Sequence, residues 1–261
     1  MSEVFVKPPK GNIEGVKPIV AKGIYEMLRQ GRRYFGSSGA SLTLQAFDPK
    51  WKEENSGLDP ALAAIGLEGE RETTLFLKKW IKDKPNAVLI YSVHIRGWGK
   101  EEVDEETGLI EGGDTDHILV LGDEVLLIDT KRWKKKANYS VGDEGQALRS
   151  NKSFPGGDLK ATQAMHMWLD YLDEDAKITT FVCINSPEVT VFRNRNWYTQ
   201  KYRLVEIDRF EELLNTKYEK IDDDDKASIN STLISQIAVG CVKPYDQYER
   251  VFDLGALQAF K

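Results

Sequence analysis

Residues 112–131 read GGDTDHILVLGDEVLLIDTK and hold two apolar runs, Ile118–Leu121 and Val125–Ile128, separated by the pair Gly122-Asp123. A Gly-X pair between two apolar runs is typical of a β-hairpin with a two-residue turn. If that turn closes, Asp116 lies directly opposite Asp129. The sequence therefore predicts a hairpin with two carboxylates facing each other at its open end.

A lysine joins these two carboxylates. Side chains alternate along a strand, so Asp129 and Lys131 project to the same side as Asp116. Like charges on directly opposed residues are destabilising, and a hard divalent cation with oxygen ligands is the simplest compensation. The alternative is an ordinary hairpin that ends in a surface Asp/Lys ion pair, which the x-D-x-K pattern alone would favour. The paired register and an upstream Gly69-Glu70 favour the cation site.

The pattern D…(D/E)xK, with Gly69-Glu70 upstream and the run Asp129-Thr-Lys-Arg-Trp133, resembles the nuclease-related domain (NERD) family of the PD-(D/E)xK nuclease superfamily. The likeness covers roughly residues 66–185. It implies an α/β fold of the restriction-endonuclease-like type, with a mixed β-sheet flanked by helices. Two features depart from the family pattern: Asp129 stands where Glu is more usual, and a lysine run replaces a Gly-containing turn.

Two further polar residues are candidates for the site. A helix is predicted over Leu67–Lys82, and on it Glu70 shares one face with Thr74, Leu77 and Ile81, so Glu70 points inward as a metal ligand or water-positioning group. The alternative for Glu70 is a first-turn acid that favours the helix dipole. Gln163 is implied by the resemblance, because family members carry a Gln at the start of the corresponding helix. The apolar stripe of the helix predicted over 158–172 does not support this cleanly, since Gln163 lies far from its centre.

The expected cofactor is Mg²⁺, with Mn²⁺ as a second choice, because the candidate ligands are all oxygens and no cysteine or histidine pair is offered. Asp116, Asp129, the Thr130 carbonyl and Glu70 would hold the ion, and Lys131 would orient a water or neutralise charge in the transition state. His117 points to the opposite face and is treated as a packing or hydrogen-bonding residue. The expected reaction is endonucleolytic hydrolysis of phosphodiester bonds in DNA.

The net charge of −6 gives the whole chain no attraction to nucleic acid, so DNA contact must depend on local charge. Lys131 opens a run of five bases in six residues. Its members Arg132, Trp133, Lys134, Lys135 and Lys136 are candidates for phosphate contact and base stacking. The alternative is a solvated charged face.

Residues 1–66 are expected to form a basic N-terminal extension of unknown role, and residues 67–261 the nuclease-like domain. Residues 1–40 hold seven Lys/Arg against three Glu, a balance of +4. This segment is either an arm that touches phosphate or a solvated helix, and a protein partner or a second copy of the chain could dock there.

The remaining pattern predicts helices over 19–31, 209–214 and 227–239, an acidic turn over 222–226, and strands over 42–47, 86–95, 137–141, 146–149, 177–184, 188–192 and 203–207. Residues 101–106 are expected to be a solvated acidic loop. Cys183 and Cys241 are expected to be reduced core residues. No apolar run approaches the ~18 residues that a membrane span needs, so an intracellular, cytoplasmic protein without membrane contact is expected.

Two rival functions remain open on the sequence. One is a catalytically inactive module that keeps the fold and binds DNA or a protein partner, for example within a phage or mobile-element complex. The other is a nuclease directed at RNA or at branched DNA. One fold hosts many activities, so the fold alone does not decide between them.

Overall fold

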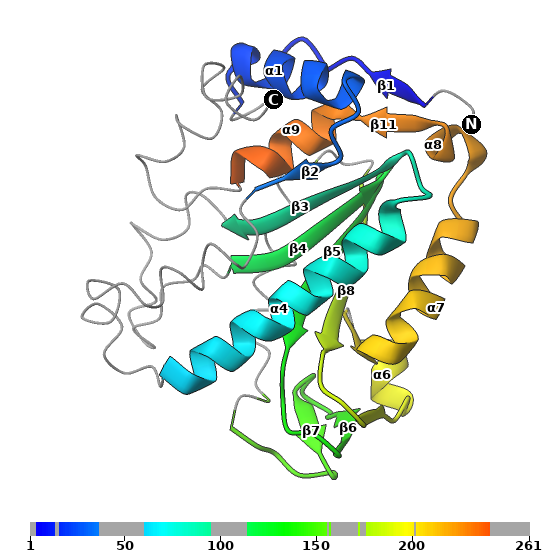
Figure 1. Cartoon of the computed structure of the whole chain (residues 1–261). Coiled ribbons are helices and arrows are strands. Elements are labelled where there is room, and N and C mark those ends of the chain that lie inside the picture. Colours follow the sequence, from blue (N-terminus) through cyan, green and yellow to red (C-terminus); the bar gives the residue numbers. More distant parts are fainter. Residues whose placement is uncertain are drawn as a thin grey trace, which may run out of the picture.

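The computed structural model describes residues 4–13, 16–36, 60–94, 114–155, 157, 172, 176–200 and 202–240. A six-stranded sheet with the order β10-β8-β5-β4-β3-β2 forms the centre of the molecule (Figure 1). Its strands are β2 (Tyr34–Phe35), β3 (Ala87–His94), β4 (Asp114–Leu121), β5 (Glu124–Lys131), β8 (Lys177–Ile184) and β10 (Tyr202–Glu206). Strands β3, β4 and β5 are antiparallel, whereas β2, β8 and β10 each pair in parallel with a neighbour.

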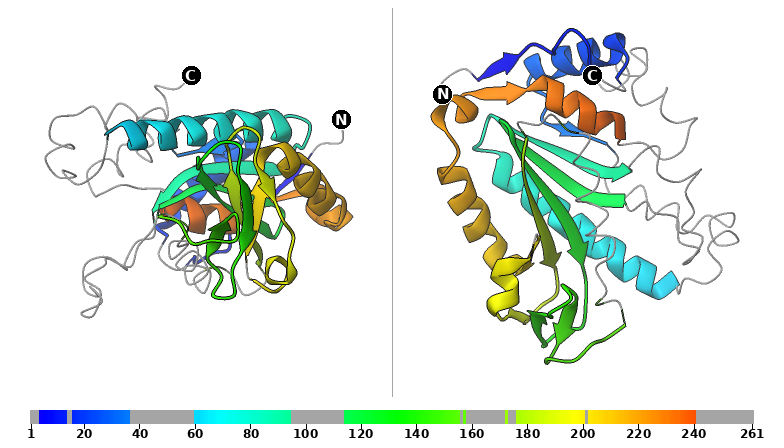
Figure 2. Two further views of the ribbon diagram at one scale, coloured as in Figure 1. Left: turned by 90° about the horizontal axis from the view of Figure 1, so that it is seen from below. Right: turned by 180° about the vertical axis from the view of Figure 1, so that it is seen from behind.

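Helices cover both faces of this sheet (Figures 1 and 2). On one face, α4 (Pro60–Ile81) and α7 (Ile207–Glu219) pack against one set of alternating strand residues, which includes Leu119, Leu126 and Phe181. On the other face, α1 (Pro18–Arg29) and α9 (Ser231–Gly240) pack against the complementary set, which includes Val120 and Leu127. The predicted mixed α/β class is confirmed, and the arrangement is consistent with a restriction-endonuclease-like fold.

The central hairpin has the predicted register. Ile118 pairs with Leu127, Val120 with Val125, and Leu121 with Glu124 across the turn at Gly122. Gly122 has a φ of +62°, a conformation that side-chain-bearing residues rarely adopt. The turn residue was predictable because both strands of the hairpin are local in sequence.

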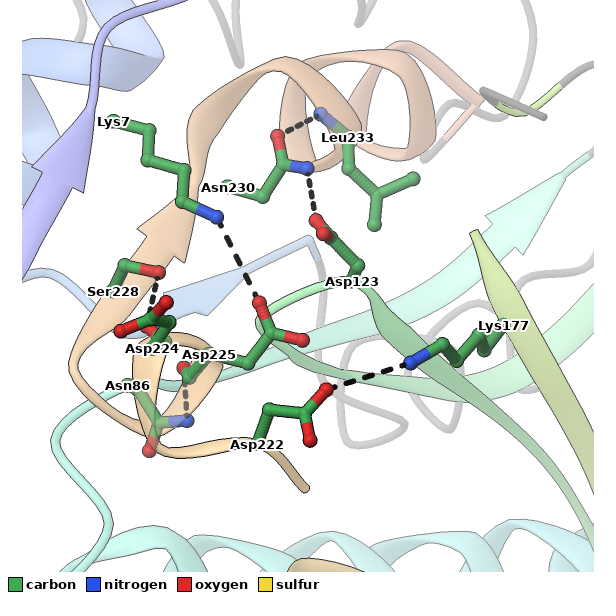
Figure 3. Close-up of polar contacts among 10 residues, drawn as sticks. All are labelled: Lys7, Asn86, Asp123, Lys177, Asp222, Asp224, Asp225, Ser228, Asn230 and Leu233. Atoms are coloured by element: carbon green, nitrogen blue, oxygen red, sulfur yellow. Dashed lines mark hydrogen bonds and ion pairs between the residues drawn. The ribbon is translucent and has the colours of Figure 1, made fainter. Parts of the chain in front are cut away.

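The C-terminal part of the described chain fastens this turn (Figure 3). Asn230 donates a hydrogen bond to Asp123 Oδ1 (2.6 Å) and accepts one from the backbone N–H of Leu233 (3.1 Å), so it caps α9 and holds the turn at once. A Cβ added at Gly122 would come within 2.5 Å of Asp225 Cβ, so only glycine fits there. The predicted acidic turn over 222–226 is a short helix, α8 (Asp223–Lys226).

The N-terminal segment contributes to the same fold. Strand β1 (Phe5–Lys7) pairs in parallel with β11 (Ser228–Asn230), α1 packs beside α9, and β2 forms an edge of the six-stranded sheet. The helix predicted over 227–239 is therefore wrong at its start: residues 228–230 are extended because they pair with β1. The boundary expected at residue 66 falls inside α4, which begins at Pro60.

A second, smaller sheet lies beyond the carboxyl ends of β5 and β8 (Figure 1). It has the order β7-β6-β9, from β6 (Asn138–Val141), β7 (Ala147–Arg149) and β9 (Thr190–Val191), and is followed by the short helix α6 (Arg195–Thr199). Tyr139, Val191 and Trp197 pack with Val182 and Ile184 of β8 in one apolar cluster. This cluster joins the small sheet to the central one.

Several expectations fall on residues outside the described ranges: the strand over 42–47, the loop over 101–106, the helix over 158–172, and Cys241. Cys183 is buried and has no disulfide partner among the described residues. None of the helices in the described part of the chain combines the length and apolar character that crossing a bilayer requires.

Candidate active site

The open end of the central hairpin brings a lysine and an aspartate together. Lys131 Nζ donates a hydrogen bond to Asp129 Oδ1 at 2.9 Å and lies 2.9 Å from Asp129 Oδ2. The Asp129 residue is 3% exposed, whereas 30% of the Lys131 side chain remains exposed. The buried Asp129 carboxylate is therefore paired with the Lys131 ammonium group, which remains partly exposed to solvent.

Asp116 is attached to the same corner by a backbone group. The N–H of Thr130 donates to Asp116 Oδ2 at 2.6 Å. The Cα pairs of the β4–β5 ladder end at His117 and Ile128, so the predicted rung between Asp116 and Asp129 is not part of the ladder. The Asp116 carboxylate instead reaches across to the chain between Asp129 and Lys131.

The two acids and the amine perturb one another. Burial, then the charges of Asp129 and Glu70, raise the pKa of Asp116 well above its ordinary value, although Lys131 and the Thr130 N–H oppose this. Burial lowers the pKa of Lys131, but the carboxylates of Asp129, Asp116 and Glu70 outweigh burial and raise it. Lys131 thus stays an ammonium group at neutral pH, and the negative charge on the pair of aspartates is unfavourable without a further cation.

The register of β5 with β8 fixes the face on which this cluster lies. Asp129 pairs with Val182 and Lys131 with Ile184, and residues paired in parallel strands project to the same face. Val182 and Ile184 pack against side chains of the small sheet. The charged cluster and the small sheet therefore lie on the same side of the central sheet. Glu70 comes from α4 on the other side, is partly buried, and reaches the cluster through its charge.

Asn185 is a site residue that sequence analysis missed. It directly follows β8, is 7% exposed, and donates from Nδ2 to the Gly69 carbonyl (2.9 Å) and to Thr73 Oγ1 (3.1 Å) on α4. Its own N–H donates to the carbonyl of Lys131 at 2.8 Å. Asn185 therefore ties the helix turn that carries Glu70 to the end of β5. A polar residue directly after a buried parallel strand was the available signal.

His117 has the role expected of it. It is 1% exposed, and its Nε2 shares a hydrogen bond with Thr74 Oγ1 at 2.7 Å. Burial lowers its pKa to about 3, so the imidazole is neutral over the physiological range. His117 packs between β4 and α4 on the face opposite the carboxylates.

Arg132 differs from the expectation of a free phosphate-binding residue. Its guanidinium pairs with Glu72 at 2.6 Å and with Glu68 at 3.5 Å, and only 14% of its side chain is exposed. Glu68 and Glu72 of α4 hold this side chain against the helix. A Cβ added at Gly69 would lie 3.1 Å from Arg132 Cβ, so the glycine lets the helix approach closely.

Trp133 also differs, because it is not an exposed stacking platform. The ring is partly buried and packs against Tyr139 and Phe154, with centroids 5.2 and 5.0 Å away. Lys134 and Lys135 are exposed as expected, and Lys136 is exposed with an ion pair to Glu188 at 3.4 Å. Of the predicted run, the lysines are the part that faces solvent.

The cluster offers oxygen ligands for a divalent ion, but few of them. Within the described residues there is no group of three or more His, Cys, Asp or Glu side chains placed to hold a metal. Asp129 Oδ2 is buried and lies 2.9 Å from the Lys131 ammonium group. Two carboxylates with the Thr130 carbonyl fit Mg²⁺, which is usually held by one or two carboxylates plus water and substrate oxygens. Gln163 lies outside the described residues.

Comparison with known proteins gives a family match that covers this corner. Residues 65–186 match the nuclease-related domain, NERD, a family of the PD-(D/E)xK superfamily. No curated protein matches the chain. Among solved structures, the chain is similar to protein VC1899 from Vibrio cholerae, with 14% identity and a TM-score of 0.38. That match covers 82% of this chain and 58% of the Vibrio protein.

Proposed function

We propose that this protein is a Mg²⁺-dependent nuclease that cleaves DNA internally, with Asp116, Asp129 and Lys131 at its active site. The observation that carries the proposal is the pairing of the buried Asp129 carboxylate with Lys131 beside Asp116, inside a nuclease-related domain. Two acids and one amine in this order are the side chains that phosphodiester hydrolysis needs: oxygen ligands for a cation and a fixed positive charge.

Asp116 and Asp129 would hold the ion together with the Thr130 carbonyl, and Glu70 would contribute through a water. The raised pKa of Asp116 supports this, because the crowding of the two carboxylates is relieved when a cation binds. A bound Mg²⁺ would polarise a phosphoryl oxygen and lower the pKa of a water.

Lys131 supplies a fixed positive charge to the reaction. Its raised pKa keeps the ammonium protonated, so it is unsuited to take a proton from water at neutral pH. It is suited to donate a hydrogen bond to a phosphate oxygen, where negative charge increases in the transition state. The bond to Asp129 orients the amine before substrate arrives.

A non-catalytic, DNA-binding module is the second candidate. Two observations favour it: Lys131 already compensates the Asp129 charge, and no group of three metal-ligating side chains is found among the described residues. In that case the cluster would be a structural ion pair and the nuclease fold would serve binding alone.

Cleavage of closed circles separates the two candidates. Single-stranded and supercoiled circular DNA, with RNA of the same sequence in parallel, are incubated with Mg²⁺ and the wild type, Asp129→Ala or Lys131→Ala. We expect cleavage of circular DNA by the wild type and a loss of about 10²–10³-fold in each variant. The exposed residues Asp83 and Lys79 give matched controls, Asp83→Ala and Lys79→Ala, which should cleave as the wild type does. If the wild type cleaves none of the substrates, the DNA-binding module is favoured. If it cleaves RNA alone, the substrate is RNA and not DNA.

A further inference from the structure

The small sheet and its flanking loops form a part of the molecule that we call the basic lobe, residues 132–155 and 186–200. It holds eight Lys or Arg against three Asp or Glu, a balance of +5 in a chain whose net charge is −6. This lobe is therefore clearly more basic than the chain as a whole. Local concentration of this kind is the electrostatic footprint of a polyanion-binding surface.

Much of this charge is available to a ligand. Lys134, Lys135, Lys152, Arg193 and Arg195 are exposed, and none of them forms an ion pair with a carboxylate in the described part of the chain. A solvated face usually interleaves both signs, as Arg132 does with its glutamates. Here basic side chains without an ion-pair partner lie together on one lobe, and phosphate groups are the complementary ligand.

Exposed aromatic rings accompany these bases. Phe192 is 53% exposed and Tyr198 is 62% exposed, and both belong to the segment that carries Arg193 and Arg195. Asn194 fixes this segment, because its side chain accepts from the Trp197 N–H at 3.0 Å and donates to the Val141 carbonyl at 2.7 Å. Aromatic rings held on an ordered segment beside arginines can stack on the nucleobases of a single strand. The nucleobases of a duplex are already stacked on each other and are less available.

The lobe lies next to the candidate active site. Val182 and Ile184, which anchor it, are the strand partners of Asp129 and Lys131 and project to the same face. Lys131 also leads directly into Lys134 and Lys135 along the chain. A strand bound along the lobe would therefore pass the end of β5.

We propose that the basic lobe binds a single-stranded nucleic-acid segment, through Arg193, Arg195, Phe192 and Tyr198, and leads it to Asp129 and Lys131. This inference rests on the proposed function for the fate of the strand, but the binding itself does not require cleavage. It predicts a preference that the active site alone does not imply: a single strand, or a duplex with a single-stranded end, binds more tightly than a blunt duplex.

The test is equilibrium binding with cleavage prevented. Fluorescence anisotropy in EDTA measures the affinity of the full chain for a labelled single strand and for its blunt duplex of equal length, over a range of salt concentrations. The variants are Arg193→Glu with Arg195→Glu, and Phe192→Ser with Tyr198→Ser. The control is Lys79→Glu with Lys82→Glu, which changes the same charge at exposed positions at the C-terminal end of α4, away from the small sheet (Figure 2).

We expect the single strand to bind the wild type at least about tenfold more tightly than the duplex. The arginine variant should lose about tenfold or more, and the slope of log affinity against log salt should fall by about 1.4, which corresponds to two phosphate contacts on a single strand. The aromatic variant should lose about tenfold for the single strand, with the salt slope unchanged. The control should bind as the wild type does.

Three results would overturn the inference: equal binding of single strand and duplex, an arginine variant that binds as the wild type does, or an equal loss in the α4 control. Arg193 lies over the Trp197 ring at 5.0 Å, so its replacement could disturb the fold. If circular dichroism shows that the double variant is misfolded, the binding of the single variant Arg195→Glu is used to test the inference. Failure of the proposed function is distinguishable. If the wild type cleaves nothing but shows this binding pattern, the inference about the basic lobe stands and the proposed nuclease function fails. If the wild type cleaves DNA but the variants bind as the wild type does, the inference about the basic lobe fails and the nuclease function stands.

Discussion

Asp129 and Lys131 form an ion pair in which the carboxylate is buried and the lysine side chain is partly exposed. Removing the lysine would leave two neighbouring carboxylates without a compensating charge, which is the more costly way to break such a pair. Asp116 already shows the effect of crowding, since burial and the charges of Asp129 and Glu70 raise its pKa. The crowded cluster is therefore expected to be less stable when no cation is bound.

The folded protein holds the Asp116 proton more tightly than the unfolded chain does, so the unfolding free energy falls as pH rises from the unfolded pKa, about 3.9, through the raised folded pKa. Asp116→Asn removes this loss and keeps an oxygen for the Thr130 N–H. In EDTA at neutral pH the variant should melt higher than the wild type, by about 2–4 °C for each kcal/mol recovered.

Thermal melts of both proteins between acid and neutral pH check this. The gain in Tm should vanish below pH ~3.9, where Asp116 is protonated in both states. The same variant should lose nuclease activity, because a neutral amide is a poorer ligand for a hard cation. A variant that melts lower than the wild type at neutral pH would contradict the assigned electrostatics.

The sequence predicted these residues because the hairpin is local: the Gly122-Asp123 turn and two apolar runs set the register. It did not predict that the Asp116 carboxylate would bond to the Thr130 N–H. Arg132 and Trp133 were misjudged for a different reason. Their partners, Glu72 on α4 and Phe154, are distant in sequence, and a run of bases shows nothing of its partners.

Among the elements, α4 and β8 meet at Asn185. The buried amide donates to Gly69 and Thr73, and its N–H bonds the carbonyl of Lys131, so one residue joins the helix that carries Glu70 to the strand that carries the amine. Gly69 permits this approach because a Cβ there would press on Arg132. The placement of Glu70 thus depends on contacts between elements more than on the helical pattern.

Asn185→Ala tests that dependence. The change removes two hydrogen bonds in a buried setting, so we expect a loss of about 1–3 kcal/mol in the unfolding free energy. Cleavage should also weaken, since Glu70 is no longer held toward Asp116. Urea unfolding and the cleavage assay provide the two measurements. Asn12→Ala, at an exposed asparagine, is the control, and an equally small effect of both changes would show that Asn185 does not position the helix.

The elements themselves were predicted unevenly. The central strands were found because each is a short apolar run with clear limits. Residues 228–230 were assigned to a helix because their extended form is chosen by β1, more than two hundred residues away in the chain. The start of α4 was placed too late, since Gly66 lies inside the helix, where it suggested an end.

The whole molecule consists of a sheet closed on both sides, with the small basic sheet at one end (Figures 1 and 2). The N-terminal segment helps to close it, through β1, β2 and α1. Opposite ends of the central hairpin have different tasks: the turn at Gly122 is fastened by α8 and α9, whereas the other end presents Asp129 and Lys131 beside the basic lobe. The contacts at the turn hold the two strands together, and the opposite end of the same strands carries the charged side chains.

If Asp116 and Asp129 together bind a divalent cation, the ion should raise the thermal stability of the full chain. A ligand that binds only the folded state stabilises it by about 2.7 kcal/mol at one hundred times its dissociation constant. Calorimetric melts of the wild type, Asp116→Asn and Asp129→Asn are compared in EDTA and in excess Mg²⁺ or Mn²⁺. We predict a higher Tm with either ion for the wild type and none of this rise in the two variants. A wild-type Tm that ignores both ions, or an equal rise in all three proteins, would contradict the account.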